Sequence, residues 1–202
     1  MEALWKCGEG QLRPAAPRHV PGRRLRKRHI LQLSVTITSM NDTAVTSVYL
    51  RQAVEKLCAA LGEDLVGVVL YGSHARGEAR EESDADLLVI ARGLPARWYE
   101  RAVYLHRPLK RIVGAPVLSV LGKTPEELEQ YFPSLYLDLG LDGVVLYDRD
   151  GYAARKLARI REIIVQTGLV RRRLAGGNMF WDWDRKVARP WEITWEGFRE
   201  LA

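Results

Sequence analysis

Two short groups of residues near the middle of the chain have the types and the spacing needed to hold a phosphate chain together with a metal ion. Gly72-Ser73 is followed, after ten intervening residues, by Asp84-Ala85-Asp86. A glycine at the end of a strand lets the backbone turn sharply, and its missing side chain lets phosphate oxygens approach the main chain. Asp84 and Asp86 are two residues apart, so on a strand both side chains leave the same face. The pattern predicts a site for a nucleoside triphosphate and a divalent cation.

The acid pair favours a bound cation. Two neighbouring carboxylates repel each other unless a cation neutralises them, and Mg²⁺ takes oxygen ligands that it commonly shares with phosphates. Residues 73–80 can begin a helix, whose free N–H groups would favour an anion at the same place. The sequence therefore predicts that Asp84 and Asp86 are the catalytic and metal-binding residues. It predicts that Gly72, Ser73 and Arg76 bind the nucleotide.

Each half of the pattern also has an ordinary structural explanation. Gly-Ser at the end of a strand is a common turn, and an isolated Asp-x-Asp is more often part of a solvated loop. Their occurrence together, between two apolar strands, is what favours a functional site. Arg76 could instead form a surface ion pair with Glu78 or Glu81, and His74 in the same loop is expected to be exposed to solvent.

The elements that must position these residues alternate between short apolar strands and helices. Residues 65–71 are apolar throughout, which predicts a strand covered on both faces. Strands are expected at 65–71, 84–91, 116–121 and 144–147, and helices at about 41–60, 96–108, 133–141 and 151–166. We therefore expect an α/β (α+β) fold, with a small mixed sheet of about four strands flanked by helices.

Further signals fix helix ends and describe the C-terminal part of the chain. Thr124-Pro125-Glu126-Glu127 combines a capping box with proline at the first helical position, and Gly168 is a C-terminal cap. The tryptophans that follow are expected to cover an open sheet edge or a partner interface rather than to stack on nucleobases. They are Trp181, Trp183, Trp191 and Trp195. The run Arg171-Arg172-Arg173 is expected to be solvated.

The basic charge of the chain belongs to its first segment. Residues 40–202 carry 23 basic and 23 acidic side chains, out of totals of 31 and 25, so the formal charge of +6 comes from residues 1–39. We expect three parts: a basic, disordered leader at 1–39, or a start site placed too early; a core domain at 40–150; and a C-terminal helix with a Trp-rich extension packed on the core at 151–202. A leader of this kind could also be a nucleic-acid arm.

Size and composition exclude several classes of protein. A chain of 202 residues can bury one substantial core. Its apolar runs are far too short to span a bilayer, so no membrane association is expected. Cys7 and Cys58 are widely separated and provide neither a disulfide framework nor metal-ligand spacing, which makes the cytoplasm the expected location.

Residues 70–77 and 83–89 together resemble the nucleotidyltransferase motif of the DNA polymerase beta superfamily, especially that of the minimal nucleotidyltransferases of archaea and bacteria. The resemblance is firm over residues 65–91 and weaker as far as about residue 168. It implies a polymerase-beta-like fold and the transfer of a nucleoside monophosphate, usually from ATP, to a hydroxyl group. It also implies that the Gly-Ser turn contacts the triphosphate and that the two aspartates hold metal.

The sequence departs from the family pattern in one respect. The family usually supplies a third carboxylate from the next core strand, but residues 116–121 contain none, and no acid occurs between Glu100 and Glu126. Three outcomes are open. Glu126, Glu127 or Asp138 could reach the site from a neighbouring element, the protein could work with a single metal ion, or it could bind nucleotide with little turnover.

Three functions follow from these observations. The leading one is Mg²⁺-dependent transfer of AMP from ATP to a hydroxyl acceptor, and the resemblance suggests a tyrosine of a partner HEPN-type toxin as that acceptor. The alternative is a non-catalytic, nucleotide-binding antitoxin or neutralising subunit that has lost the third carboxylate. A weaker alternative is an RNA-modifying transferase guided by the basic leader.

Overall fold

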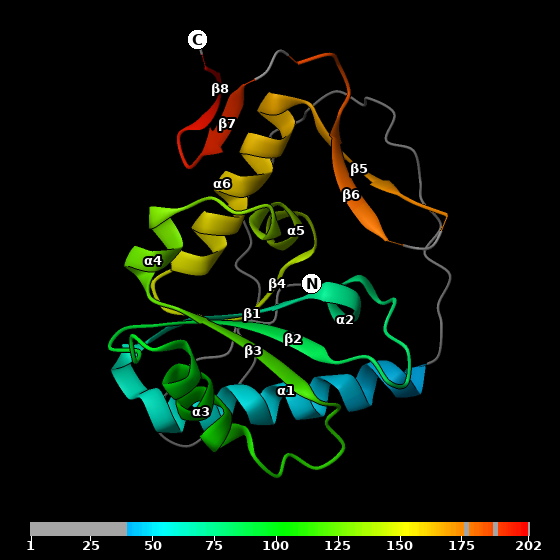
Figure 1. Cartoon of the computed structure of the whole chain (residues 1–202). Coiled ribbons are helices and arrows are strands. Elements are labelled where there is room, and N and C mark those ends of the chain that lie inside the picture. Colours follow the sequence, from blue (N-terminus) through cyan, green and yellow to red (C-terminus); the bar gives the residue numbers. More distant parts are fainter. Residues whose placement is uncertain (1–39, 176–177, 188–189, 202) are drawn as a thin grey trace, which may run out of the picture.

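Figure 1 shows a computed structural model of the chain, which describes residues 40–175, 178–187 and 190–201. The basic leader expected at 1–39 therefore lies outside the described residues. In chain order the elements are α1 (Met40–Leu61), η1 (Gly62–Asp64), β1 (Leu65–Tyr71), α2 (Gly72–Arg76), β2 (Ala85–Ala91), α3 (Trp98–Leu109), β3 (Leu118–Lys123), α4 (Pro125–Gln130), α5 (Leu135–Asp142), β4 (Val144–Asp148), α6 (Tyr152–Thr167), β5 (Leu169–Arg173), β6 (Met179–Trp183), β7 (Trp191–Thr194) and β8 (Gly197–Glu200).

A mixed sheet of four strands, in the order β3-β2-β1-β4, forms the centre of the fold. β1 is antiparallel to both β2 and β4, whereas β2 and β3 are parallel. β1 is buried along almost its whole length, as its continuous apolar run predicts. Because β2 and β3 run in the same direction, their starts lie side by side at one edge of the sheet. The expected α/β fold with a small mixed sheet is confirmed.

Helices cover both faces of this sheet (Figure 1). Alternate residues of β2 belong to two different cores, because successive side chains of a strand point to opposite faces. Leu87 shares a buried cluster with Leu57 of α1 and Leu105 of α3. Leu88 belongs to the opposite cluster with Leu139 of α5. The strand that carries Asp86 is therefore anchored from both sides.

The signals for helix ends are confirmed in atomic detail. The Thr124 hydroxyl accepts a hydrogen bond from the backbone N–H of Glu127 at 3.2 Å, and the Glu127 carboxylate accepts one from the Thr124 N–H at 3.1 Å. These two bonds are the capping box expected at the start of α4. At the end of α6, Gly168 has φ +72°, and its N–H bonds to the carbonyl of Ile164.

Three local expectations are corrected by the structure. β3 begins at Leu118, two residues later than expected. The helix after Gly72 has only five residues, because Gly77 adopts a left-handed conformation with φ +69° and closes it. The spacing of Trp98, Leu105 and Leu109 predicts that they share one face of a helix, but Trp98 is 81% exposed, since the buried residues of α3 all lie in its second half.

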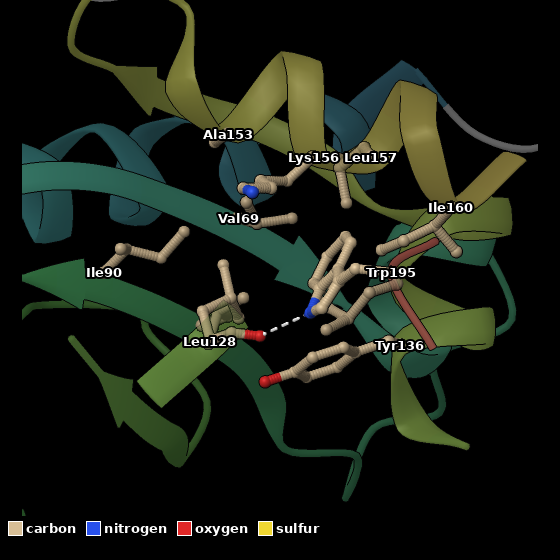
Figure 2. Close-up of a pocket in the computed structure, with 11 residues that line it drawn as sticks. Val69, Ile90, Leu128, Tyr136, Ala153, Lys156, Leu157, Ile160 and Trp195 are labelled. Atoms are coloured by element: carbon tan, nitrogen blue, oxygen red, sulfur yellow. Dashed lines mark hydrogen bonds between the residues drawn. The ribbon is translucent and has the colours of Figure 1, made fainter. Parts of the chain in front are cut away.

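The C-terminal part forms two hairpins that lie beside α5 and α6 (Figure 1). β5 and β6 make one antiparallel ribbon, here called the β5–β6 ribbon, and β7 and β8 make the other. Figure 2 shows how the turn of the second hairpin inserts Trp195 into the core, where its indole N–H donates to the Leu128 carbonyl at 3.0 Å. The indole also lies 5.6 Å from the Tyr136 ring and 4.8 Å from the Lys156 ammonium. Trp195 therefore packs against α4, α5 and α6, whereas the sequence predicted that it covers an open sheet edge or a partner interface.

None of the helices described for this chain is both long enough and apolar enough to cross a lipid bilayer.

Candidate active site

The two halves of the sequence pattern meet at one edge of the sheet, where β1 ends and β2 begins. The antiparallel pairing places Tyr71, the residue before the Gly-Ser turn, directly opposite Asp86. Gly72 has φ +72°, and a Cβ atom built on it would lie 2.2 Å from Oδ2 of Asp86. This position therefore requires glycine for two reasons, the backbone conformation and the space that the Asp86 carboxylate occupies. The turn and the acid pair form one site.

Asp86 is the partly buried acid of this site, whereas Asp84 lies just before the strand and is exposed. Burial raises the pKa of the Asp86 carboxyl above its usual value, and the nearby negative charge of Asp84 raises it further. A hydrogen bond with the Ser119 side chain opposes this shift, as do the more distant His74 and Arg76. Within the described part of the chain, no ion pair neutralises either aspartate.

These residues fit the divalent cation that the fold family implies. The donors are carboxylate oxygens, which hard cations prefer. The ionised form of Asp86 is disfavoured by burial and by its neighbouring aspartate, and a bound cation would relieve both effects. Because Gly72 has no side chain, the Asp86 carboxylate can lie directly against the turn, where a Cβ atom would meet it. Asp84 and Asp86 are accordingly the residues that would hold the ion.

His74 has a structural role that the sequence did not indicate. Its Nδ1 lies 3.2 Å from the Tyr49 hydroxyl, and its Nε2 lies 3.0 Å from the backbone carbonyl of Ser83. A neutral imidazole can satisfy both contacts by accepting at Nδ1 and donating at Nε2. The ring thus ties α1 to the residue before Asp84 and fixes the connector between the turn and the acids. The expectation of a solvent-exposed histidine is wrong.

Arg76 ends the short helix α2 and lies between two acids. Its Nε donates to Glu78 at 2.9 Å, which is one of the ion pairs expected from the sequence, and its Nη1 donates to Asp142 at 3.4 Å. The hydrogen bond from Arg76 lowers the pKa of the exposed Glu78, and Arg173 contributes to the same shift. Arg76 therefore lies next to the Gly-Ser turn, in contact with α5.

None of the three acids considered as a third carboxylate belongs to the site. Glu126 and Glu127 begin α4, which follows the end of β3, whereas Asp86 lies beside its start. Glu127 is also occupied by Arg101, with contacts of 2.5 and 2.8 Å. Asp138 accepts hydrogen bonds from Arg171 and from the Trp181 indole. Among the described residues, no three His, Cys, Asp or Glu side chains gather in a way that could hold a metal ion.

Ser119 and Arg171 are the residues that sequence reasoning missed. Ser119 is the register partner of Asp86 on β3, so a hydroxyl lies beside the partly buried carboxylate, on the strand where the family usually supplies an acid. Parallel pairing of the two strands would have indicated it, but register is not visible in the sequence. Arg171 was expected to be solvated, yet its side chain is only 12% exposed and contacts Asp142.

A small apolar cavity elsewhere in the fold is not part of this site (Figure 2). It lies between the sheet and α6 and is lined by residues such as Val69, Ile90, Leu157 and Trp195. None of the residues assigned from the sequence lines it. Its apolar walls suit core packing better than a phosphate group.

Comparison with known proteins defines the class. The profile described as a nucleotidyltransferase domain matches residues 50–139, a range that contains the turn and both aspartates. Over 130 residues the chain is 32% identical to a protein of Methanocaldococcus jannaschii that is provisionally named a protein adenylyltransferase. That alignment covers 61% of this chain and 86% of the archaeal protein. The chain belongs to the nucleotidyltransferase family and is a nucleotidyltransferase.

Solved structures give weaker similarities. One is a nucleotidyltransferase, provisionally assigned, from Sulfolobus solfataricus, with 18% identity and a TM-score of 0.42 over 58% of this chain and 95% of that one. Another is the complex of a tri-AMPylated Shewanella oneidensis HEPN toxin with an MNT antitoxin. Its matched chain has 14% identity and a TM-score of 0.38 over 59% of this chain and 90% of that one. Similarity at this level carries no information on substrate or partner.

Proposed function

We propose that this protein is a Mg²⁺-dependent nucleotidyltransferase that transfers AMP from ATP to a hydroxyl acceptor. The observation that carries the proposal is the contact between the two halves of the motif, because the Asp86 carboxylate lies so close to Gly72 that a Cβ atom there would be 2.2 Å from its Oδ2. A glycine turn next to a negatively charged, incompletely neutralised acid pair suits a phosphate chain that arrives with a cation.

In the proposed reaction, the hydroxyl oxygen of the acceptor attacks the α-phosphorus of ATP. A new P–O bond forms, the bond from the α-phosphorus to the oxygen bridging to the β-phosphorus breaks, and pyrophosphate leaves with the electron pair. The hydroxyl proton passes to water. Such transfers depend on positioning and charge neutralisation more than on covalent participation by the protein.

Each site residue has a distinct task in this proposal. Gly72 and Ser73 receive the triphosphate, through the exposed backbone of the turn and a hydroxyl donor. Asp84 and Asp86 hold the divalent ion, which would neutralise phosphate charge and activate the acceptor hydroxyl when bound. Arg76 contacts phosphate with the guanidinium donors that Glu78 and Asp142 leave free.

The choice of ATP and of a protein acceptor rests on the relative from Methanocaldococcus jannaschii, whose provisional name describes a protein adenylyltransferase. The family resemblance adds a more specific candidate, a tyrosine hydroxyl of a HEPN-type toxin. A purified HEPN-type protein, if one is encoded beside this chain, is therefore the acceptor to test first. The basic leader that would favour an RNA acceptor lies outside the described residues, and RNA is the less favoured substrate.

One observation favours the alternative, a neutralising subunit that binds nucleotide without turnover. No third carboxylate joins Asp84 and Asp86 among the described residues, and the neighbouring position on β3 is occupied by Ser119. With fewer acidic ligands, a second ion would be held weakly. The alternative predicts Mg²⁺-assisted ATP binding without pyrophosphate release.

Incubation with labelled ATP, Mg²⁺ and candidate acceptors distinguishes the two functions. We expect pyrophosphate release and labelling of the acceptor by the wild-type protein. Asp84→Asn should abolish both, and Asp64→Asn is a matched control, because Asp64 is an exposed acid at the opposite end of β1. ATP binding without release, even with the correct partner present, would favour the neutralising subunit. No Mg²⁺-assisted ATP binding at all would contradict both.

A further inference from the structure

A continuous series of ion pairs connects Arg76, beside the nucleotide turn, to the β5–β6 ribbon. Asp142, the last residue of α5, accepts from Nη1 of Arg76 at 3.4 Å. The same carboxylate is held by Arg171 of β5 through two contacts, one of them from Nη2 to Oδ1 at 2.8 Å. The side chains of Asp142 and Arg171 are only 11% and 12% exposed. A bidentate pair with this little exposure has a well-defined geometry.

Arg171 is itself fixed by the elements around it. Its Nη1 donates to Asp138 at 3.1 Å, and its guanidinium carbon lies 5.9 Å from the centre of the Trp181 ring. The Trp181 indole N–H donates to the same Asp138 oxygen at 3.2 Å. Arg171 therefore has two acids and an aromatic ring as partners, so it cannot change its position without the loss of several contacts.

The arrangement leaves part of the Arg76 guanidinium free. Two of its five N–H donors are used, Nε by Glu78 and one on Nη1 by Asp142. Within the described residues, no hydrogen bond involves its Nη2. Two acids on different sides fix the plane of the group, and they leave the third nitrogen available to an anion. A planar group held in this way loses little freedom when it binds phosphate.

We propose that Arg171 is a positioning residue of the nucleotide site, acting through Asp142 on Arg76. The inference rests on the proposed function, because it assumes that Arg76 contacts phosphate. Its basis is that Nη1 of both arginines contacts one atom, Oδ2 of Asp142. The β5–β6 ribbon then belongs to the active site, in addition to covering α5.

The test compares two neighbouring arginines of the same strand. Arg171 reaches α5, whereas Arg172 pairs with Asp182 inside the ribbon and is half exposed. Calorimetric titration with Mg²⁺ and ATP should show about five- to tenfold weaker binding by Arg171→Gln, the range expected for one misplaced charge-assisted contact. Arg172→Gln should bind like the wild type. Equal weakening by both variants would indicate a general effect on the ribbon and would overturn the proposal.

A double-variant cycle separates positioning from folding. If Arg171 acts through Arg76, adding Arg171→Gln to Arg76→Gln should weaken ATP binding no further. Independent, additive losses would overturn the proposal. Asp142→Asn, which keeps the shape of the side chain, should also weaken binding, and tighter binding would show that Asp142 restrains Arg76 instead of presenting it.

The outcome can be assigned to one proposal or the other. A wild-type protein that binds no ATP in the presence of Mg²⁺ would contradict the proposed function, and this inference with it. Normal binding that is weakened by Arg76→Gln but not by Arg171→Gln would leave the proposed function intact and overturn the inference alone.

Discussion

Asp86 and Glu127 are carboxylates at opposite ends of the same pair of parallel strands, and their electrostatic surroundings are opposite. Burial and the charge of Asp84 raise the pKa of Asp86. Hydrogen bonds from Arg101 lower the pKa of Glu127, which also closes the capping box with Thr124. One acid lacks a cation in the described part of the chain, and the other has an arginine in bidentate contact.

The difference indicates which acid serves the fold and which serves a ligand. A carboxylate matched by an arginine and a helix start stabilises the structure as it stands. A partly buried carboxylate beside a second acid costs stability unless a cation is bound, and such groups are concentrated at functional sites. Glu127 has the residue type of a third metal-binding carboxylate. Its contacts with Arg101 and Thr124 exclude it from the metal site.

The largest effect is expected from the removal of the Asp86 charge. Asp86→Asn should lower nucleotidyl transfer by at least about 100-fold, the scale of losing one group that stabilises charge in a transition state. The folded-state pKa of Asp86 lies above its unfolded value, so ionisation of this group destabilises the fold as the pH rises through that interval. The variant should therefore unfold at a higher temperature than the wild type in metal-free buffer at neutral pH.

Both halves of this prediction are needed. Transfer assays with ATP and Mg²⁺ give the first, and thermal unfolding in the presence of a chelator gives the second. A variant that loses both activity and stability would show that Asp86 supports the fold in the same way as Glu127, and the contrast between the two acids would disappear.

The second effect concerns the glycine that shares space with Asp86. Gly72→Ala places a Cβ atom 2.2 Å from the carboxylate oxygen and keeps a φ of +72°, which a side chain rarely adopts. We expect at least about tenfold weaker Mg²⁺-assisted ATP binding and a loss of stability of about 1–2 kcal/mol. Gly77→Ala is the matched control, because Gly77 also has positive φ but a Cβ atom added to it would meet nothing within 4 Å. Equal loss of ATP binding in both variants would attribute the effect to the backbone alone.

A smaller effect is expected at Ser119. Its hydrogen bond lowers the pKa of Asp86, so Ser119→Ala should raise that pKa further. Since the ionised carboxylate binds the cation, the acidic limb of the pH profile for Mg²⁺-assisted ATP binding should move to higher pH. Affinity at high pH, where the carboxylate is ionised in both proteins, should change little. A uniform loss of affinity across the pH range would point to a packing defect instead.

The smallest functional effect is expected at the other end of the strands. Glu127→Gln weakens the contacts with Arg101 and should cost about 1 kcal/mol of stability, because the glutamate is about one-third exposed. Transfer and ATP binding should equal those of the wild type. Chemical denaturation and the labelled-ATP assay together measure the two outcomes, and a large loss of transfer would restore Glu127 as the missing third acid.

The sequence determined those features that depend on local chemistry. The apolar run of β1, the Thr124 capping box and the Gly168 cap all follow from residues within one turn or one strand of each other. The Gly-Ser turn and the acid pair could also be recognised as one motif in the sequence, because only one short connector separates them. Their assignment as nucleotide and metal ligands is still a prediction, as is the division into a leader, a core and an extension.

Only the tertiary structure decided which distant residues meet. The sequence shows the acids Glu127, Asp138 and Asp142 but not their partners, since Arg101 and Arg171 lie on other elements. The contact between Ser119 and Asp86 was equally hidden in the sequence, because it depends on the register of the parallel strands β2 and β3. A side chain's charge is set by its type, but whether that charge is neutralised depends on long-range contacts. For this reason the pattern of residues indicated the chemistry, and the fold determined which residues are free to perform it.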